Sequence, residues 1–201
     1  MVLDSGASLL SEVKNPYLFM MACLCHDFGK ITATGIYDGV IKSINHENTG
    51  DELIKNFLNR ITNEKKVFKY VLNMTHNHMM PNKYARDNAS IKATNKMFDD
   101  SICPSDLIIL SHADNLGKVS DLGFVDHRPF LEERLALYNE LMARPYVMGA
   151  DLEEAGLRPH KLYKEALVFA HKLRLAGVCK DKALPQVVAY FNELKKQKYS
   201  N

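Results

Sequence analysis

The sequence predicts an all-α fold, because helical periodicity recurs along most of the chain and strand signals are scarce. The apolar side chains of residues 46–61 fall on one face of an amphipathic helix. These side chains are Leu53, Ile54, Phe57, Leu58 and Ile61. A second apolar helix is predicted over 107–117, after Pro104, which is typical of a helix start. Together the two segments indicate a compact helical bundle within residues 16–118.

The N-terminal part of the chain predicts two helices and a hairpin. Residues 5–14 have the spacing of the later turns of a helix, which Asn15-Pro16 ends. Residues 17–25 are almost entirely apolar and indicate a buried helix. Asp38-Gly39 stands between two apolar pairs, and because this dipeptide is typical of a tight turn, a short β-hairpin is expected there.

The rest of the chain predicts further helices separated by prolines and polar turns. Pro81 is expected to close a helix over 66–79, and a loop follows at 82–87. The remaining helices are expected over 90–98, 129–143, 151–155, 161–176 and 184–196. A boundary near Arg144-Pro145 is expected to divide the chain into a domain over 1–144 and a small helical segment over 145–201.

The composition is typical of a globular protein, and a cytoplasmic location is expected. Of the 201 residues 46% are hydrophobic, which is enough for a buried core. The net charge of +2 does not demand a nucleic-acid partner, although a local basic patch is compatible with it. The four cysteines lack Cys-x-x-Cys spacing and no apolar run has the length of a membrane span, so reduced thiols and no membrane partner are expected.

The segment 23–30, Cys-Leu-Cys-His-Asp-Phe-Gly-Lys, is the centre of the candidate site. His26 and Asp27 stand side by side at the end of an apolar run. One imidazole and one carboxylate form a mixed donor set that suits Mn, Fe, Co, Ni or Zn better than Ca. Lys30 adds a cation beside the pair. The alternative is a histidine that interacts with the end of its helix without any metal.

Metal ligands are predicted at two further positions, Asp114 and His76. Asp114 lies inside an apolar helix, where a carboxylate is costly to bury unless it is paired or bound to a metal. The alternative for Asp114 is an ion pair with Lys118 or Arg128. His76 and His78 are two positions apart, so both are not expected to face one pocket. His76, which is closer to the body of its helix, is the predicted ligand, and His78 is expected on the solvent side or in a supporting position.

The order His-Asp, His, His, Asp across helices resembles the HD superfamily of metal-dependent phosphohydrolases. More narrowly, segments 24–30 and 46–50 are similar to the HD domain of bacterial tRNA nucleotidyltransferases, the CCA-adding enzymes and their poly(A) polymerase relatives. The similarity continues at His76 and at 113–118, Ala-Asp-Asn-Leu-Gly-Lys, and extends to 149–152, 156–159 and 175–177. It implies an HD-domain helical bundle with a small C-terminal helical appendage.

The resemblance implies a metal-dependent phosphohydrolase. The implied metal ligands, which would hold one or two ions of Mn, Ni, Co, Fe, Zn or Mg, are His26, Asp27, His76 and Asp114. Asp27 would also accept a proton from the attacking water, and Lys30 and His46 would bind the substrate phosphate. The implied substrates are phosphoesters of nucleotides or RNA ends, such as 2′,3′-cyclic phosphates and 2′-nucleotides. The implied partners are tRNA and a second copy of the chain.

The sequence departs from this family in two ways. It has no counterpart of the nucleotidyltransferase head, so it is not expected to add nucleotides. HD domains also carry an earlier histidine, whereas none precedes His26. Because residues 1–4 resemble the segment that follows this histidine, the chain is expected to be a truncated part of a longer protein that binds metal weakly. The alternative is a naturally short protein that uses His46 or water instead.

Two other functions remain open from the sequence. One is an inactive or weakly metal-binding module for tRNA binding or dimerisation, the C-terminal fragment of a longer CCA-adding enzyme. The other is an HD enzyme that acts on free nucleotides without any link to RNA. Bound metal would separate the enzyme from the module, and competition by tRNA would separate the two enzymes.

Overall fold

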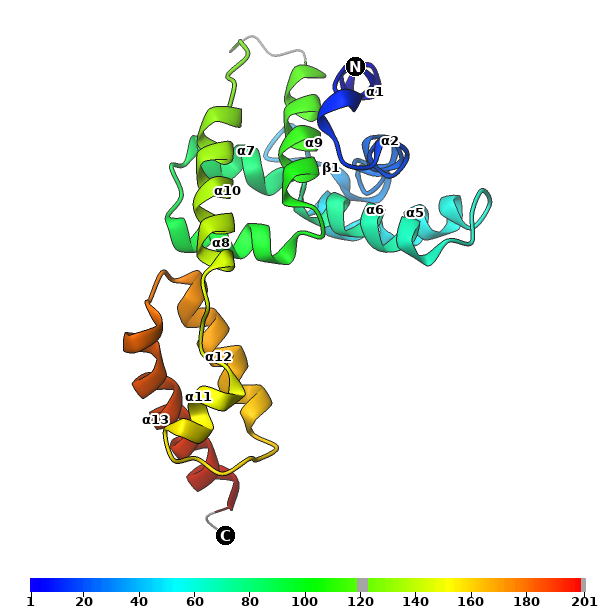
Figure 1. The fold of residues 1–201 in the computed structure, drawn as a ribbon. Coiled ribbons are helices and arrows are strands. Elements are labelled where there is room, and N and C mark those ends of the chain that lie inside the picture. Colours follow the sequence, from blue (N-terminus) through cyan, green and yellow to red (C-terminus); the bar gives the residue numbers. More distant parts are fainter. Residues whose placement is uncertain (119–122, 200–201) are drawn as a thin grey trace. The chain divides into compact units, whose positions relative to one another are not determined.

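The computed structural model describes residues 1–118 and 123–199 (Figure 1). Helices make up nearly all of the regular structure, and the one sheet within these residues has two strands. The all-α prediction is therefore confirmed. The chain forms two compact units, one of residues 1–89 and 97–135, the other of residues 90–96 and the chain from Ala136 onward.

The first unit contains most of the elements. In chain order they are α1 (Val2–Ser8), η1 (Leu10–Glu12), α2 (Pro16–Cys25), α3 (Lys30–Ala33), β1 (Thr34–Tyr37), β2 (Val40–Ser43), α4 (His46–Thr49), α5 (Asp51–Leu58), α6 (Lys65–Asn77), α7 (Met79–Arg86) and α9 (Pro104–Leu116). Helices α8 (Ile91–Asp100) and α10 (Arg128–Ala143) contribute residues to both units. Helix α2 packs against α1, α6 and α9, and α9 also packs against α7. These contacts make α2 and α9 the central helices of the unit.

Helix α2 begins at a clear sequence signal. The Asn15 side chain accepts a hydrogen bond from the Leu18 backbone N–H at 3.1 Å, and Pro16 occupies the first turn. Its buried side chains are Leu18, Phe19, Ala22, Cys23 and Cys25. These residues fall on one broad face of α2, which packs against α1, α6 and α9, whereas Tyr17 and Leu24 on the other side are exposed. The helix predicted from the apolar run is confirmed, although only one face of it is buried, and His26 follows its C-terminal end.

Helix α9 is buried from Asp106 to Asp114. At its N-terminal end, the Asp106 carboxylate accepts hydrogen bonds from the Tyr70 hydroxyl at 2.7 Å and from the Lys14 backbone N–H at 3.1 Å. A buried carboxylate is tolerated there because protein donors replace the water that it loses. The two bonds connect α9 to α6 and to the turn before α2, which fixes the helix that carries Asp114.

The predicted hairpin is confirmed. Strands β1 and β2 pair antiparallel, with Ile36 opposite Ile41 and Tyr37 opposite Val40. The turn between them has positive φ angles of 52° at Asp38 and 75° at Gly39, as a type I′ turn requires. The four paired side chains are exposed, so the hairpin adds nothing to the core. Its end leads directly into α4.

Three segments differ from the sequence prediction. The helix expected over 5–14 ends at Ser8 in α1 and is followed by the 3₁₀ turn η1. The helix expected over 46–61 is divided at Gly50 into α4 and α5, because the Gly50 backbone lies against that of Gly29. The segment 82–87, expected as a loop, belongs mostly to α7. Pro81 stands in the first turn of α7, where its missing N–H costs no helical hydrogen bond. The proline therefore marks the start of a new helix as well as the end of α6.

The second unit has a core of its own. It contains α11 (Gly149–Glu154), α12 (Tyr163–Leu175) and α13 (Lys180–Tyr199). Helices α12 and α13 pack side by side (Figure 1). The buried residues of this core are Val147, Leu152, Leu162, Ala166, Ala170, Ala183, Val187 and Phe191. The boundary expected at 144/145 follows α10, whereas the compact units divide within that helix. None of the helices in the described part of the chain is both long and apolar enough to cross a membrane.

Candidate metal centre

The His26-Asp27 pair lies in a largely buried group of five side chains, hereafter the cluster: His26, Asp27, His46, His78 and Asp114. His26 follows the C-terminal end of α2, His46 begins α4, and His78 lies between α6 and α7. Asp114 comes from the last turns of α9. The three histidines and Asp114 are between 1% and 5% exposed. Helices from four parts of the chain thus contribute to one site.

The Asp27 carboxylate lies among the three imidazoles. Its Oδ1 is 3.1 Å from His46 Nε2 and 3.8 Å from His78 Nε2. Its Oδ2 is 3.2 Å from His26 Nε2 and 2.6 Å from Lys30 Nζ. The ligand atoms of His26, Asp27 and His78 all lie within 4.8 Å of one another. Ligands about 2.0–2.2 Å from a shared ion are at most roughly 4.4 Å apart, so a small closure would bring these three to a common metal.

The same local hydrogen bond orients each imidazole. Nδ1 of His26, His46 and His78 lies 2.9, 2.9 and 2.6 Å from the backbone carbonyl oxygen three residues earlier. Since a carbonyl only accepts, Nδ1 donates its proton in each ring, and Nε2 of the neutral ring keeps its lone pair. The three Nε2 atoms are buried and make no hydrogen bond of good geometry, although the Asp27 carboxylate is close.

The charges in the cluster favour a bound cation. Burial opposes protonation of His26, but Asp114 and Asp27 outweigh it and raise the pKa of His26 to about 9. Burial would raise the pKa of the Asp27 carboxyl, but His26 and Lys30 hold it well below its ordinary value. In contrast, burial lowers the pKa of His78 to about 4, so this imidazole is neutral at pH 7. The field that favours a proton at His26 Nε2 also favours a metal ion.

Asp114 is shared between the cluster and Lys118. Its Oδ1 is 3.6 Å from His26 Nε2, and its Oδ2 is 2.5 Å from Lys118 Nζ. Burial would raise the pKa of Asp114, but His26 and Lys118 lower it, so the carboxylate is ionised at neutral pH. Asp114 therefore makes the ion pair with Lys118 that the sequence suggested, while it also lies beside His26 in the cluster. Arg128, the other candidate partner, contacts Glu12 instead.

The structure brings His78, and not His76, to the cluster. His76 Nε2 contacts Asp51 Oδ1 at 2.6 Å, and its side chain is 37% exposed. The buried stripe of α6 recurs at intervals of three and four residues and reaches position 78 next. The earlier members of this stripe are Val67, Val71 and Met74. The periodicity thus contained a signal for His78, whereas closeness to the helix body, which favoured His76, did not identify the buried histidine.

Two glycines allow the backbone beside Asp27 to touch α4. A Cβ on Gly29 would lie 1.8 Å from the His46 carbonyl oxygen, and a Cβ on Gly50 would lie 2.8 Å from the Gly29 nitrogen. The Thr49 hydroxyl also donates to the Gly29 carbonyl oxygen at 3.3 Å. Only glycine permits so close an approach. The contact holds His46 within reach of Asp27.

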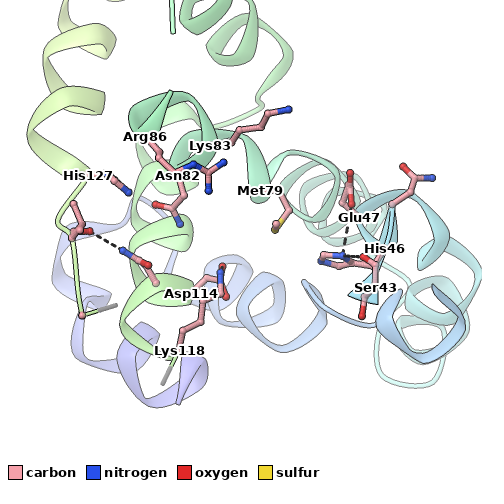
Figure 2. A pocket seen from close by; sticks show the side chains of 14 residues that line it. Ser43, His46, Glu47, Met79, Asn82, Lys83, Arg86, Asp114, Lys118 and His127 are labelled. Atoms are coloured by element: carbon pink, nitrogen blue, oxygen red, sulfur yellow. Dashed lines mark hydrogen bonds and ion pairs between the residues drawn. The ribbon is translucent and has the colours of Figure 1, made fainter. Parts of the chain in front are cut away.

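A pocket of about 560 Å³ lies beside the cluster (Figure 2). Its lining residues are Ser43, Asn45, His46, Glu47, Met79, Asn82, Lys83, Arg86, Asp114, Asn115, Lys118, Gly123, Val125 and His127. His46 and Asp114 belong to both the cluster and the pocket. Lys30, predicted to bind phosphate, contacts Asp27 and does not line this pocket. The lining also includes three cations on α7 and after α9, which is a favourable environment for an anionic ligand.

The cluster fits a divalent transition metal. It offers imidazole nitrogens and carboxylate oxygens, the mixed donors that Mn, Fe, Co, Ni and Zn accept. The Nδ1–carbonyl bonds orient the rings in the way that metal-binding histidines are usually held. Buried nitrogens without hydrogen-bond partners are costly, and a metal ion would satisfy those of His26 and His78.

A family model described as the HD domain matches residues 1–117, a range that contains all five residues of the cluster. Comparison with curated proteins and with solved structures found no match to the chain. The matched range also ends at the C-terminal end of α9, so it leaves out the helices α11, α12 and α13.

Proposed function

Because the chain belongs to the HD-domain family of metal-dependent phosphohydrolases, we propose that it hydrolyses phosphoesters of nucleotides or RNA ends with a divalent metal at the cluster. The convergence of three buried Nε2 atoms around Asp27, beside a pocket with cationic lining, is the observation that carries this proposal. The nitrogens supply metal ligands, and the cations supply partners for a phosphate.

The proposed metal ligands are His26, Asp27, His78 and Asp114, with His46 at the side that faces the pocket. This set contains His78 in place of the His76 predicted from the sequence. The mixed nitrogen and oxygen donors favour Mn, Fe, Co, Ni or Zn, whereas Mg prefers a shell of oxygen ligands.

The residues of the cluster would divide the chemistry among them. A bound divalent ion lowers the pKa of a water molecule and neutralises charge on the phosphoryl oxygens. Asp27 stays ionised at neutral pH and can accept a proton from the attacking water. Lys30, whose Nζ lies 2.6 Å from Asp27, keeps this carboxylate oriented and adds positive charge beside it. His46 lines the pocket and would position the substrate.

We assign the substrate to the nucleotides and RNA ends, including tRNA ends. The resemblance of segments 24–30 and 46–50 to the HD domain of tRNA nucleotidyltransferases favours 2′,3′-cyclic phosphates and 2′-nucleotides. The pocket supports this class, because it combines cations, the amides of Asn82 and Asn115, and the apolar Met79. Such a mixture suits a ligand with both a phosphate and a base.

Metal retention by two histidine variants tests the proposed ligands. We expect His78→Ala to lower the affinity for Mn or Co at least about 10–100-fold, the scale of even a lost supporting contact. His76→Ala is the matched control and should retain the metal, because His76 contacts Asp51 outside the cluster. Elemental analysis after dialysis against a weak chelator gives the readout. Loss of metal from His76→Ala with full metal in His78→Ala would reverse the ligand assignment.

Hydrolysis by the metal-loaded protein tests the reaction. Suitable substrates are bis-p-nitrophenyl phosphate, adenosine 2′,3′-cyclic phosphate, adenosine 2′-phosphate and tRNA ending in a cyclic phosphate. Asp27→Asn keeps the shape of the side chain and should reduce turnover by at least about 100-fold, since both the charge and the proton acceptor are lost. A protein that holds its metal but hydrolyses none of the four substrates would contradict the proposal and favour a binding module.

A further inference from the structure

Helix α7 connects the cluster with a cationic face of the pocket. His78 is the residue immediately before this helix. The residues of α7 that line the pocket stand at positions i, i+3, i+4 and i+7, which share one helix face. They are Met79, Asn82, Lys83 and Arg86. Figure 2 shows Asn82, Lys83 and Arg86 across the pocket from His46 and Glu47, with Met79 nearer to these two residues.

The two cations on this face, Lys83 and Arg86, make few contacts with other protein groups. Among the residues that the structure describes, the Lys83 side chain has no ion pair or hydrogen bond, and it is exposed. Arg86 contacts only its neighbour Asp87, through Nε at 3.1 Å. An arginine that uses Nε alone keeps its terminal N–H groups for a further anion.

The other charges of the pocket lie nearer the cluster and already have partners. Lys118 contacts Asp114 at 2.5 Å, and Glu47 lies 3.8 Å from His46 Nδ1. The pocket is therefore polarised, with its carboxylates on the cluster side and its least engaged cations on α7. A ligand that spans the pocket would meet positive charge at the end away from the metal ligands.

The helix also separates these cations from the cluster. At a rise of 1.5 Å per residue, Lys83 and Arg86 lie about 7.5 and 12 Å along the axis from His78. This is too far for both side chains to hold a phosphate that is bound to the metal ligands, and their reach covers an anion farther along the ligand. The geometry therefore calls for two anionic groups on one substrate.

Resting on the proposed function, we propose that Lys83 and Arg86 determine specificity by binding a second phosphate, while the cluster receives the phosphoester to be cleaved. The substrate class is then a nucleotide with two separate phosphates: a nucleoside bisphosphate, or an RNA end whose last nucleotide keeps its 5′-phosphate link. Lys83 supplies a point charge and Arg86 a planar fork that matches phosphate oxygens. Nucleoside monophosphates lack the second contact and are poorer substrates.

A pair of cyclic phosphates that differ only in the second phosphate tests this inference. Adenosine 2′,3′-cyclic phosphate is compared with its 5′-phosphorylated form. We expect kcat/KM to be roughly 10–25 times higher for the 5′-phosphorylated form, since two exposed charge pairs contribute about three- to fivefold each. Lys83→Met and Arg86→Gln should each lower this ratio about three- to fivefold, and the double variant should bring it close to 1. Lys69→Met, which removes an exposed lysine of α6 outside the pocket, is the control and should leave the ratio unchanged.

Binding of adenosine 3′,5′-bisphosphate and adenosine 3′-monophosphate, measured by calorimetry, gives a second readout that needs no turnover. Wild type should prefer the bisphosphate by roughly 10–25-fold and the double variant by less than about twofold. Equal affinities in wild type, a preference that survives in the double variant, or no binding of either probe would overturn the inference. A bisphosphate preference without any hydrolysis would support it while contradicting the proposed function, so the two failures are distinguishable.

Discussion

The position of His46 depends on the absence of two side chains elsewhere. Gly29 and Gly50 let the backbone beside Asp27 meet α4 at a separation that no other residue permits, with a Cβ on Gly29 only 1.8 Å from the His46 carbonyl oxygen. His46 Nε2 then lies 3.1 Å from Asp27 Oδ1. At the scale of single residues, these glycines are positioning residues that act on the cluster through the backbone.

We expect Gly29→Ala to weaken metal binding by about 10–100-fold, because the displaced His46 changes the support of Asp27. The same overpacking should lower the free energy of unfolding by about 1–3 kcal/mol. Gly149→Ala is the control, since a Cβ there would meet only the Tyr163 ring, at 3.9 Å. Chelator competition gives the affinity, and urea denaturation gives the stability. Wild-type metal affinity in Gly29→Ala would show that the cluster does not depend on this contact.

Helices and turns were predicted correctly where signals within the segment itself determine them, and less well where a distant contact does. Helix α2 and the β1–β2 hairpin follow from an Asn-Pro start, an apolar run and an Asp-Gly turn, and all are confirmed. The break between α4 and α5 has a different origin, because it arises from contact with Gly29, which lies in another part of the chain. No periodicity within 46–61 contains that information.

The helices also explain how much of the site was predictable. His26, Asp27 and Asp114 stand out in sequence because polar groups interrupt apolar helices, and the structure brings them together. His78 required a comparison of its position with the buried stripe of α6. The sequence did not predict that Lys83, Arg86 and Lys118 line one pocket, because only the packing of α7 against α9 brings these residues to the same side.

The hydrogen bond from Tyr70 on α6 to Asp106 on α9 gives a prediction at the scale of elements. Tyr70→Phe removes the shortest of three hydrogen bonds to the buried Asp106 carboxylate, so we expect a loss of about 1–3 kcal/mol in the free energy of unfolding. Tyr17→Phe changes an exposed side chain and should have little effect. Urea denaturation followed by circular dichroism measures both variants. A loss in Tyr70→Phe no larger than in Tyr17→Phe would show that the Lys14 backbone N–H and the Ser105 hydroxyl satisfy the carboxylate without Tyr70.

At the scale of the whole molecule, the chain forms two units with separate cores. All five residues of the cluster belong to the first unit, and the HD-domain match lies within residues 1–117. The second unit is held by the apolar contacts of α11, α12 and α13. Metal binding is therefore expected to act on the stability of one unit only.

Hydrogen exchange with and without Mn or Co tests this expectation. Metal at about 100 times its Kd should stabilise the first unit by about 2.7 kcal/mol, which slows amides that exchange through its unfolding by about 100-fold. Amides in α12 and α13 should keep their exchange rates, because these helices contain no residue of the cluster. Equal slowing in both units would show that they unfold together.

The wide spacing of the cluster along the chain has a consequence for synthesis. A ribosome adds about 5–20 residues per second, so Asp114 follows His26 by several seconds. During this time the nascent chain carries the His-Asp pair without the later donors, and it lacks α9, against which α2 packs. Only a chain synthesised through α9 contains the complete donor set. Metal capture by the full set therefore follows the synthesis of α9 and cannot guide folding steps that come before it.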